Sequence, residues 1–271
     1  MDTKYEVYKY EHIELTENET INYVVYSHSS FLDILNIQTD FLLGKGHLTL
    51  FIDYNNLNLD EIYNKYDKVI FYNPNLNYAQ KLLSCINQIE YSYFVFIHDN
   101  DILLYSDNKV INSLIFFLKI NNFDRIDFQL SYDFHETFKI ENDDLFLVKT
   151  ICPFTIEWKS RYAYNVNPSI WKRETLIDIL EKFSYKDYRN IEDEETQSYC
   201  KKFNIFKLSA KKIYRCGYFT CLEPFKYLHI THSQMLFSPK SIPEENSKDI
   251  INDYNMIIEK YNLKKSNKWI G

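Results

Sequence analysis

The chain has 271 residues, of which 45% are hydrophobic and 17% aromatic, and its formal net charge at pH 7 is −7. This composition excludes a disordered chain and predicts a globular protein with a sizeable core. Sequence-independent nucleic-acid binding needs a basic face, and no block of Lys or Arg stands out here. We therefore expect no nucleic-acid partner.

Membrane insertion and secretion are also disfavoured. No run approaches the ~20 apolar residues of a transmembrane helix, and residues 1–20 are polar and acidic, without the apolar core of a signal peptide. The five cysteines are odd in number and scattered, which is typical of free thiols in a reducing compartment. We expect a cytoplasmic protein without a transmembrane segment.

The scarcity of glycine excludes several enzyme classes. Only four glycines occur, Gly44, Gly46, Gly217 and Gly271, so there is no G-x-G-x-x-G fingerprint and no G-x-S-x-G elbow. Gly44 and Gly46 flank a lysine, but they lead into a strand pattern and not into the helix of a P-loop. A Rossmann dehydrogenase, a P-loop kinase and an α/β-hydrolase are therefore disfavoured.

The first hundred residues alternate between strand and helix patterns. Apolar runs predict strands at 21–26, 47–53, 68–72 and 93–97. Helical spacing predicts helices from about 30 to 42, with Ser29 or Ser30 as N-cap, and at 59–66 and 76–89. This alternation predicts a parallel sheet built from right-handed βαβ units.

The remaining chain adds further elements without a linker or an internal repeat. Helices are predicted at 107–119, capped by Ser106, and at 172–183, 190–203 and 244–263. Strands are predicted at 124–130, 145–151, 205–208, 212–214 and 227–230. The aromatic segment 153–171 has little periodicity, and we interpret it as an irregular binding segment. We predict one domain over residues 1–271.

The most informative stretch runs from Tyr91 to Leu104. Its apolar run, Tyr93 to Ile97, predicts a strand buried on both faces. Polarity changes abruptly after it, at Asp99 and Asp101, where an open α/β sheet binds ligands. An Asp-x-Asp pair there can direct oxygen ligands at a divalent cation that holds a diphosphate. The alternative is a turn with two solvated aspartates, because Asp and Asn are common in turns.

Two other strand ends should lie at the same edge. Ser27 and Ser29 follow the first strand, and Asp53 ends the second. Because the carboxyl ends of parallel strands meet at one edge, we expect these side chains near Asp99 and Asp101. The alternative for Asp53 is that it only starts a turn.

Four segments, in this order, resemble nucleotide-sugar-dependent glycosyltransferases of the GT-A fold. They are VVYSHSSFLDIL, NYAQKLLSCINQIEYSYFVFIHDNDILL, NVNPSIWKRETLIDIL and the residues Ile191-Glu192-Asp193 that open a late helix. The resemblance implies a Rossmann-related, mostly parallel central sheet flanked by helices in a single domain. It further implies a nucleotide-binding half at 21–130, an acceptor-side half at 131–243 and a C-terminal helix at 244–271.

The resemblance also implies roles for individual residues. The donor-binding candidates are Ser27, Ser29, Asp53, Asp99 and Asn100. The candidates for holding Mn²⁺ or Mg²⁺ are Asp99, Asp101, His229 and His232. For each histidine the alternative is a satisfied buried side chain. Trp158 is a candidate platform for the acceptor. His98, directly before the pair, departs from the family pattern, as does the lack of a Gly-rich loop.

A separate carboxylate should act as the base. In an inverting member, an acid at the start of the late helix takes the proton of the acceptor hydroxyl, and Glu192 and Asp193 match that place. A carboxylate within ~3 Å of the hydroxyl can do this. The alternative is that these acids only complement the dipole of their helix.

These features and the resemblance together predict a metal-dependent glycosyltransferase, for which an inverting mechanism is favoured over a retaining one. Its donor would be a nucleotide sugar, most simply a UDP-sugar, and its acceptor a glycan or glycoconjugate. One alternative is a nucleotidyltransferase, although that class usually needs a third acid and a Gly-rich phosphate loop. Another is a non-catalytic module that binds a nucleotide or a sugar.

Overall fold

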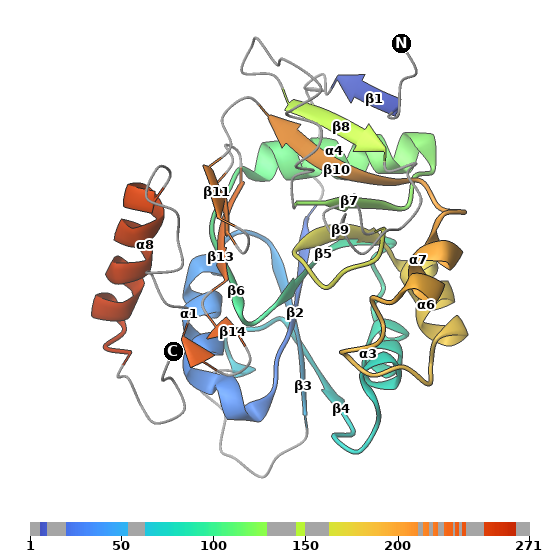
Figure 1. Ribbon diagram of the computed structural model, residues 1–271. Helices are drawn as coiled ribbons and strands as arrows, with labels where there is room; N and C mark the ends of the chain where they lie inside the picture. The colour runs from blue at the N-terminus through green and yellow to red at the C-terminus, as the bar shows by residue number, and fades with distance from the viewer. Residues whose placement is uncertain are drawn as a thin grey trace.

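The computed structural model describes residues 6–9, 20–53, 63–128, 145–149, 163–210, 214–216, 219–221, 225–229, 231–232, 235–236 and 247–263. Its largest element is a nine-stranded sheet (Figure 1). In spatial order the strands are β1 (Glu6–Lys9), β8 (Leu145–Lys149), β10 (Ile205–Ala210), β7 (Arg125–Asp127), β9 (Ser169–Lys172), β5 (Tyr93–His98), β2 (Asn22–Tyr26), β3 (His47–Asp53) and β4 (Lys68–Tyr72).

The sheet is mostly parallel, as predicted. The pairs β2–β3, β2–β5, β3–β4 and β7–β10 are parallel, and only β8 and β9 run against the other strands. The sequence does not predict β9, which comes from the aromatic segment and lies between β5 and β7. Because β9 pairs with both β5 and β7, it joins β1, β8, β10 and β7 to β5, β2, β3 and β4 in one sheet.

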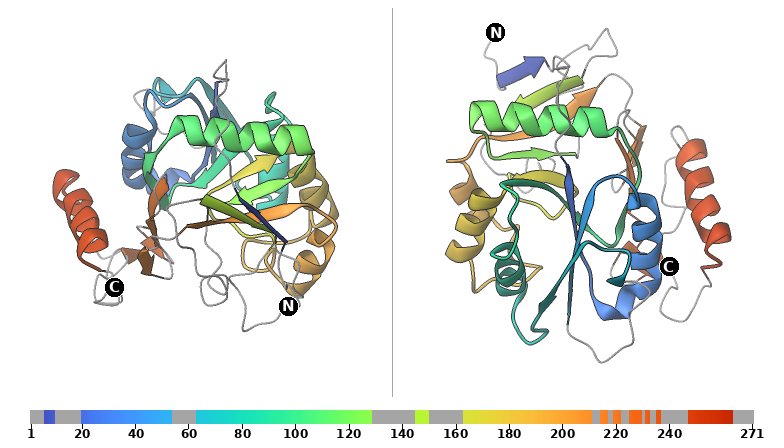
Figure 2. Two further views of the ribbon diagram at one scale, coloured as in Figure 1. Left: turned by 90° about the horizontal axis from the view of Figure 1, so that it is seen from above. Right: turned by 180° about the vertical axis from the view of Figure 1, so that it is seen from behind.

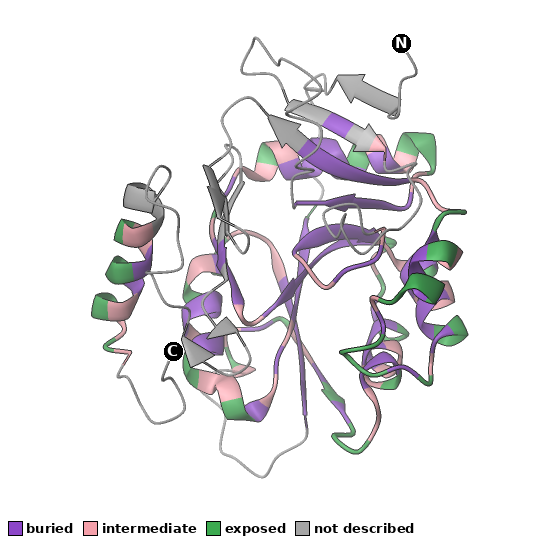
Figure 3. Ribbon diagram, viewed as in Figure 1, coloured by how far each residue is buried: buried purple, intermediate pink, exposed green. Residues whose placement is uncertain are grey.

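Helices cover both faces of the sheet. They are α1 (Leu32–Leu42), α3 (Tyr78–Ile86), α4 (Asn108–Asn121), α6 (Arg173–Lys182) and α7 (Glu194–Cys200). Tyr23 and Val25 of β2 pack in the cluster formed with α1 and α4, and Val24 packs in the cluster formed with α3 and α6. Figures 1 and 2 show α1 and α3 on opposite sides of β2. Strands covered on both faces become continuously apolar, and all of β5 is buried accordingly (Figure 3).

A smaller antiparallel sheet adjoins α1. Its strands, in order, are β11 (Tyr214–Cys216), β12 (Phe219–Cys221), β13 (Phe225–His229) and β6 (Asp101–Ser106). The last helix, α8 (Ser247–Lys260), packs Tyr254 and Ile257 against Ile34 and Ile37 of α1. A two-stranded ribbon follows β13, formed by β14 (Thr231–His232) and β15 (Met235–Leu236). Within the described residues, no helix is both long and apolar enough to cross a membrane.

Two predicted helix caps are wrong. Neither Ser29 nor Ser30 caps α1, because a 3₁₀ turn over Ser29–Phe31 precedes that helix and the His28 side chain caps the turn. The cap of α4 is Asp107 and not Ser106, since its carboxylate accepts the Lys109 N–H. Ser106 is instead the last residue of β6, a strand that the sequence does not predict. Of the helix predicted at 59–66, residues 59–62 lie outside the described residues.

The start of α3 is fixed by a reciprocal cap. The Asn77 side chain accepts the Gln80 N–H, and the Gln80 side chain accepts the Asn77 N–H. This capping box satisfies two backbone donors that would otherwise have no partner in the helix. It sets the position of Tyr78, the first residue of α3, which is buried at the carboxyl edge of the sheet.

Candidate active site

Three strand ends meet at the carboxyl edge of the sheet. β2 lies between β3 and β5, and its first residue beyond the strand, Ser27, donates its N–H to the Phe51 carbonyl of β3. On the other side, the Asp99 N–H donates to the Tyr26 carbonyl. The structure therefore brings together Ser27, Ser29, Asp53 and Asp99, as their places at strand ends predict.

Asp99 is held by hydrogen bonds and is nevertheless hard to ionise. The Ser27 hydroxyl donates to its Oδ2 at 2.6 Å, and the backbone N–H groups of His28 and Asn100 also reach it. Burial outweighs these hydrogen bonds and raises the pKa of Asp99 from 3.8 to about 7, and the nearby Asp101 raises it further. No positive side chain in the described ranges pairs with the charged form of this carboxyl.

Asn100 and Asp101 add oxygen atoms beside Asp99. The Asn100 Oδ1 is buried and has no hydrogen-bond partner within the described part of the chain, and an unpaired buried acceptor costs about 1–3 kcal/mol. Asp101 begins β6 and is only 4% exposed, so it is not the solvated turn residue of the alternative reading. Two carboxylates and an amide oxygen are the hard ligands that Mg²⁺ and Mn²⁺ prefer.

The described residues do not complete a metal shell by themselves. Within the described ranges, no three His, Cys, Asp or Glu side chains converge on one point. In the β6–β13 ladder, His229 lies opposite Asp101. The side chains of His229 and His232 fall outside the described part of the structure. A bound cation would therefore take its remaining ligands from elsewhere, and diphosphate oxygens are of the right type.

Asp53 organises the loop that follows β2. Its Oδ1 accepts the Ser29 N–H at 2.5 Å and its Oδ2 accepts the Ser29 hydroxyl at 2.7 Å. The His28 Nε2 lies 3.4 Å from the same Oδ2. Asp53 is 4% exposed, so it does more than start a turn. Together with the Tyr72 hydroxyl, which donates to the Ser27 carbonyl at 2.6 Å, it holds the loop against the sheet.

An aromatic cluster, formed by Tyr26, Tyr72, Tyr78, His98 and Tyr188, lies beside the carboxylates. The rings of Tyr26 and Tyr72 are stacked at 5.3 Å, and the Tyr78 hydroxyl hydrogen-bonds the His98 Nε2 at 2.9 Å. The ring of Tyr188 packs against both Tyr78 and His98. Sequence reasoning missed the cluster because its members come from strands, a helix and a loop far apart in the chain, and no local pattern joins them.

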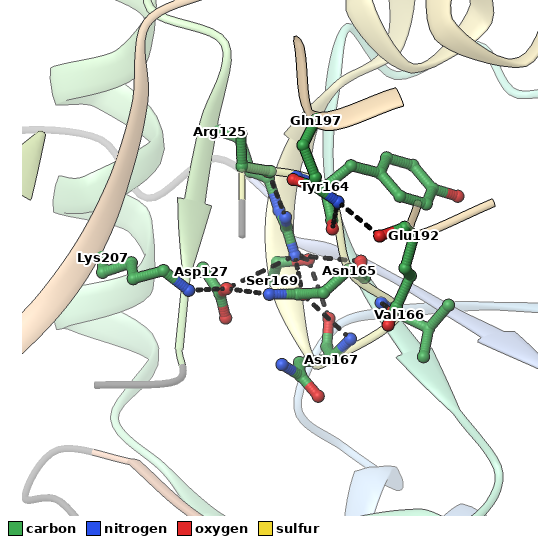
Figure 4. Close-up of polar contacts among 11 residues, drawn as sticks. Arg125, Asp127, Tyr164, Asn165, Val166, Asn167, Ser169, Glu192, Gln197 and Lys207 are labelled. Carbon is green, nitrogen blue, oxygen red and sulfur yellow. Dashed lines mark hydrogen bonds and ion pairs between the residues drawn. The ribbon is translucent and has the colours of Figure 1, made fainter. Parts of the chain in front are cut away.

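The two candidate bases have different environments. The Glu192 Oε1 accepts the Val166 N–H at 2.8 Å, and burial raises the pKa of Glu192 (Figure 4). Asp193 is the N-cap of α7 and forms an ion pair with Lys186 at 2.6 Å. Although burial acts in the opposite direction, hydrogen bonds from Lys186 and Thr196 lower the pKa of Asp193. The carboxylate of Asp193 is thus already engaged by the fold.

Glu192 borders a buried polar network that the sequence does not reveal. The side chains of Arg125, Asp127 and Lys207 are fully buried. Asp127 Oδ2 accepts from Lys207 at 2.8 Å and from Asn165 at 2.6 Å. Arg125 donates to the backbone carbonyls of residues 163 and 165. Figure 4 shows that this network holds the segment whose Val166 N–H reaches Glu192.

The aromatic segment contains two tryptophans, Trp158 and Trp171. Trp158 lies outside the described residues, so its predicted acceptor role stays a prediction. Trp171 lies in β9, is 1% exposed and carries the Arg125 guanidinium over its ring at 4.4 Å. It belongs to the hydrophobic core.

Two hollows lie at the opposite, amino-terminal edge of the strands. One of about 360 Å³ is lined by residues that include Ile21, Gly46 and Asn108, and one of about 310 Å³ by residues that include Asn22 and His47. Neither contains a predicted site residue. Asp99, whose pKa is raised, and the buried Asn100 Oδ1 lie at the carboxyl edge. Such groups indicate a functional site more directly than the volume of a hollow does.

Comparisons with known proteins give likenesses in structure only. No protein-family model and no curated protein matches the chain. Similar solved structures include S. aureus TarS 1–349 in complex with UDP-GlcNAc, at 12% identity and a TM-score of 0.45, covering 90% of this chain and 66% of that one. UDP-glucose pyrophosphorylase complexed with UDP-glucose has 13% identity and a TM-score of 0.44, covering 87% and 99%.

The glycosyltransferase GlyE of Streptococcus pneumoniae TIGR4 is similar at 8% identity and a TM-score of 0.43, covering 70% of this chain and 45% of that one. The chain therefore spans less than two thirds of the TarS and GlyE structures. These similar structures include both a glycosyltransferase and a nucleotide-sugar pyrophosphorylase. At such low similarity they do not decide the chemistry, which has to be argued from the side chains.

Proposed function

We propose that this protein is a metal-dependent glycosyltransferase that moves a sugar, with inversion, from a nucleotide-sugar donor to a glycan or glycoconjugate. The observation that carries the proposal is the oxygen cluster at the end of β5. There the pKa of Asp99 is raised to about 7, the Asn100 Oδ1 is buried without a partner among the described residues, and Asp101 is buried next to them. A divalent cation would stabilise the ionised form of Asp99 and give the Asn100 Oδ1 a partner.

The leaving group explains why such a site is useful. Cleavage of the bond between the sugar and the diphosphate leaves negative charge beside an acidic protein. Mn²⁺ or Mg²⁺, when bound, supplies Lewis-acid stabilisation of that charge. In this assignment Asp101 and Asp99 hold the cation. His229, which lies opposite Asp101 in the ladder, is the preferred further ligand, and His232 is the alternative.

The nucleoside would lie over the ends of β2 and β3. Asp53 and Ser29 shape this surface through their paired hydrogen bonds, while Ser27 orients Asp99. With Asn100 between the two aspartates, these residues form the donor-binding set. The donor is proposed to be a UDP-sugar.

Glu192 is the proposed base. A base must ionise and then take a proton near neutral pH, and burial raises the pKa of Glu192 toward that range. Asp193 is the second choice, because its carboxylate caps α7 and pairs with Lys186. Trp158 is proposed as a platform for the acceptor.

Calorimetry and a turnover assay test the proposal. UDP should bind in the presence of Mn²⁺ and much more weakly in EDTA. A nucleotide at 100 times its dissociation constant stabilises a protein by about 2.7 kcal/mol, so a thermal-shift panel of UDP, UDP-glucose and UDP-GlcNAc provides an independent readout. Release of UDP from a nucleotide sugar in the presence of a glycan acceptor would support transfer.

The same assays separate the alternatives. A nucleotidyltransferase would instead release pyrophosphate from UTP and a sugar 1-phosphate. A binding module would take up UDP and Mn²⁺ without turnover. If no nucleotide binds with or without Mn²⁺, the proposed function is wrong.

A further inference from the structure

We propose that Tyr188, supported by Tyr78 and His98, is the platform on which the transferred sugar ring of the donor lies. This inference rests on the proposed function, because it takes the donor to be a nucleotide sugar. Tyr188 lies in the segment between α6 and α7, four residues before Glu192. It is 46% exposed, whereas Tyr78 and His98 beneath it are buried.

The packing of Tyr188 joins the two segments that carry the proposed chemistry. Its ring meets the Tyr78 ring edge to face, with centroids 5.2 Å apart and an interplanar angle of 84°. Its centroid lies 6.0 Å from that of His98, the residue directly before Asp99. His98, which contacts Tyr188, is thus adjacent to the proposed metal ligands. The segment that carries Tyr188 leads to Glu192, the proposed base.

The electrostatic surroundings agree with this position. Burial raises the pKa of Tyr188, and the carboxylates of Asp101, Glu192 and Asp99 raise it further. The phenol therefore lies within the field of both the proposed metal ligands and the proposed base. Its hydroxyl makes no hydrogen bond to any described residue, so it can donate to or accept from a ligand.

The reaction geometry points to the sugar as the occupant. In an inverting transfer, the leaving diphosphate and the attacking hydroxyl lie on opposite sides of the anomeric carbon. If Asp99 and Asp101 hold the diphosphate and Glu192 activates the hydroxyl, the sugar ring lies between them. Tyr188 lies close enough to both groups to interact with their charges. It offers an apolar ring with a polar tip, which suits a surface of C–H and O–H groups.

Contacts within the fold hold Tyr78 and His98, the two side chains that support Tyr188. The Tyr78 hydroxyl is hydrogen-bonded to His98 at 2.9 Å, and the capping box at Asn77 fixes the start of α3. The Tyr26 ring also packs on Tyr78, with the ring centroids 5.6 Å apart. A preorganised aromatic surface loses little entropy when a ring lies on it.

Calorimetry on the full chain tests the inference through binding alone. UDP with Mn²⁺ and UDP-glucose or UDP-GlcNAc with Mn²⁺ are titrated into the wild type, Tyr188→Ala, Tyr188→Leu and Tyr188→Phe. We expect Tyr188→Ala to bind UDP as the wild type does and to bind the better UDP-sugar roughly tenfold more weakly, about 1.4 kcal/mol. Tyr188→Phe should keep most of the sugar affinity, because it keeps the ring.

Tyr185→Ala is the matched control. Tyr185 lies in the same segment and is 63% exposed, and its hydroxyl donates to Glu195 and not toward the aspartates. It should bind UDP and UDP-sugar as the wild type does. Tyr188→Leu keeps apolar volume over Tyr78, so it reports on the site even if Tyr188→Ala folds poorly.

The outcomes distinguish the inference from the function on which it rests. Equal weakening of UDP and UDP-sugar by Tyr188→Ala and Tyr188→Leu would assign the ring to the nucleobase and overturn the inference. An unchanged ratio of the two affinities, or a change confined to the KM of the acceptor, would also overturn it while leaving the proposed function intact. If the wild type binds no nucleotide with Mn²⁺, both fail.

Discussion

The Ser27 hydroxyl donates a hydrogen bond of 2.6 Å to the Asp99 Oδ2 across the ends of two neighbouring parallel strands. It directs the Oδ2 of Asp99 toward the end of β2. Loss of a group that orients a metal ligand in this way typically costs about 10- to 100-fold in metal affinity. Ser27 is therefore a positioning residue for the proposed cation site.

Replacing Ser27 should weaken metal binding without abolishing it. Ser27→Ala removes the hydrogen bond that orients Asp99, and we expect Mn²⁺-dependent UDP binding to fall by about 10- to 100-fold. Calorimetry with and without Mn²⁺ measures the change. Equal affinity in Ser27→Ala and the wild type would show that Asp99 needs no such support.

Replacing Asp101 should have a larger effect. Asp101→Asn keeps the size of the side chain but removes a charge, so the Mn²⁺-dependent part of UDP binding should fall by more than about tenfold and turnover should be lost. Glu90→Gln is the control, because the Glu90 side chain is 90% exposed and distant from the site in the fold. Full activity of Asp101→Asn, or of the wild type in EDTA, would contradict the metal role.

Glu192 should impose a pH dependence on transfer. A base acts in its ionised form, so kcat should rise with pH, and burial should move the midpoint above the 4.5 of an ordinary glutamate. In Glu192→Gln the rise of kcat with pH should disappear, while UDP binding persists. Glu194→Gln, at the exposed first turn of α7, is the matched control.

The raised pKa of Glu192 also predicts how the Glu192→Gln substitution affects stability. An acid whose pKa is raised in the folded state destabilises the fold as pH rises above its unfolded pKa, because ionisation is harder when it is buried. Glu192→Gln should therefore be at least as stable as the wild type at pH 8, as measured by Tm. If it melts much earlier and also loses UDP binding, Glu192 supports the fold and Asp193 becomes the base to test.

In the buried network, loss of Asp127 should reduce stability more than loss of Lys207. Asp127→Ala leaves Lys207 without its carboxylate in the core, and breaking such a pair costs about 3–5 kcal/mol. Lys207→Met should cost less, because Asp127 keeps Asn165 at 2.6 Å and Arg125 at 3.7 Å. Urea denaturation gives both free energies of unfolding. Equal losses would mean that Arg125 and Asn165 do not compensate Asp127.

Local patterns in the sequence determined the first half of the fold. Buried apolar runs predicted β2, β3, β4 and β5, and helical spacing predicted the helices that cover them. The acids and serines at the strand ends could also be placed at one edge, because parallel strands bring their carboxyl ends together. These inferences succeed because period and polarity are properties of neighbouring residues.

Tertiary structure decided the rest, because it depends on contacts between distant residues. The insertion of β9 between β5 and β7 brings Ser169 beside Phe96 and Asp127. The pattern of apolar residues in this segment does not predict a strand. Only packing distinguishes Glu192, which faces the network, from Asp193, which caps α7. The contact of Tyr188 with His98 spans ninety residues. Such pairings are selected by the burial and hydrogen bonding of the whole chain, so the segments alone cannot specify them.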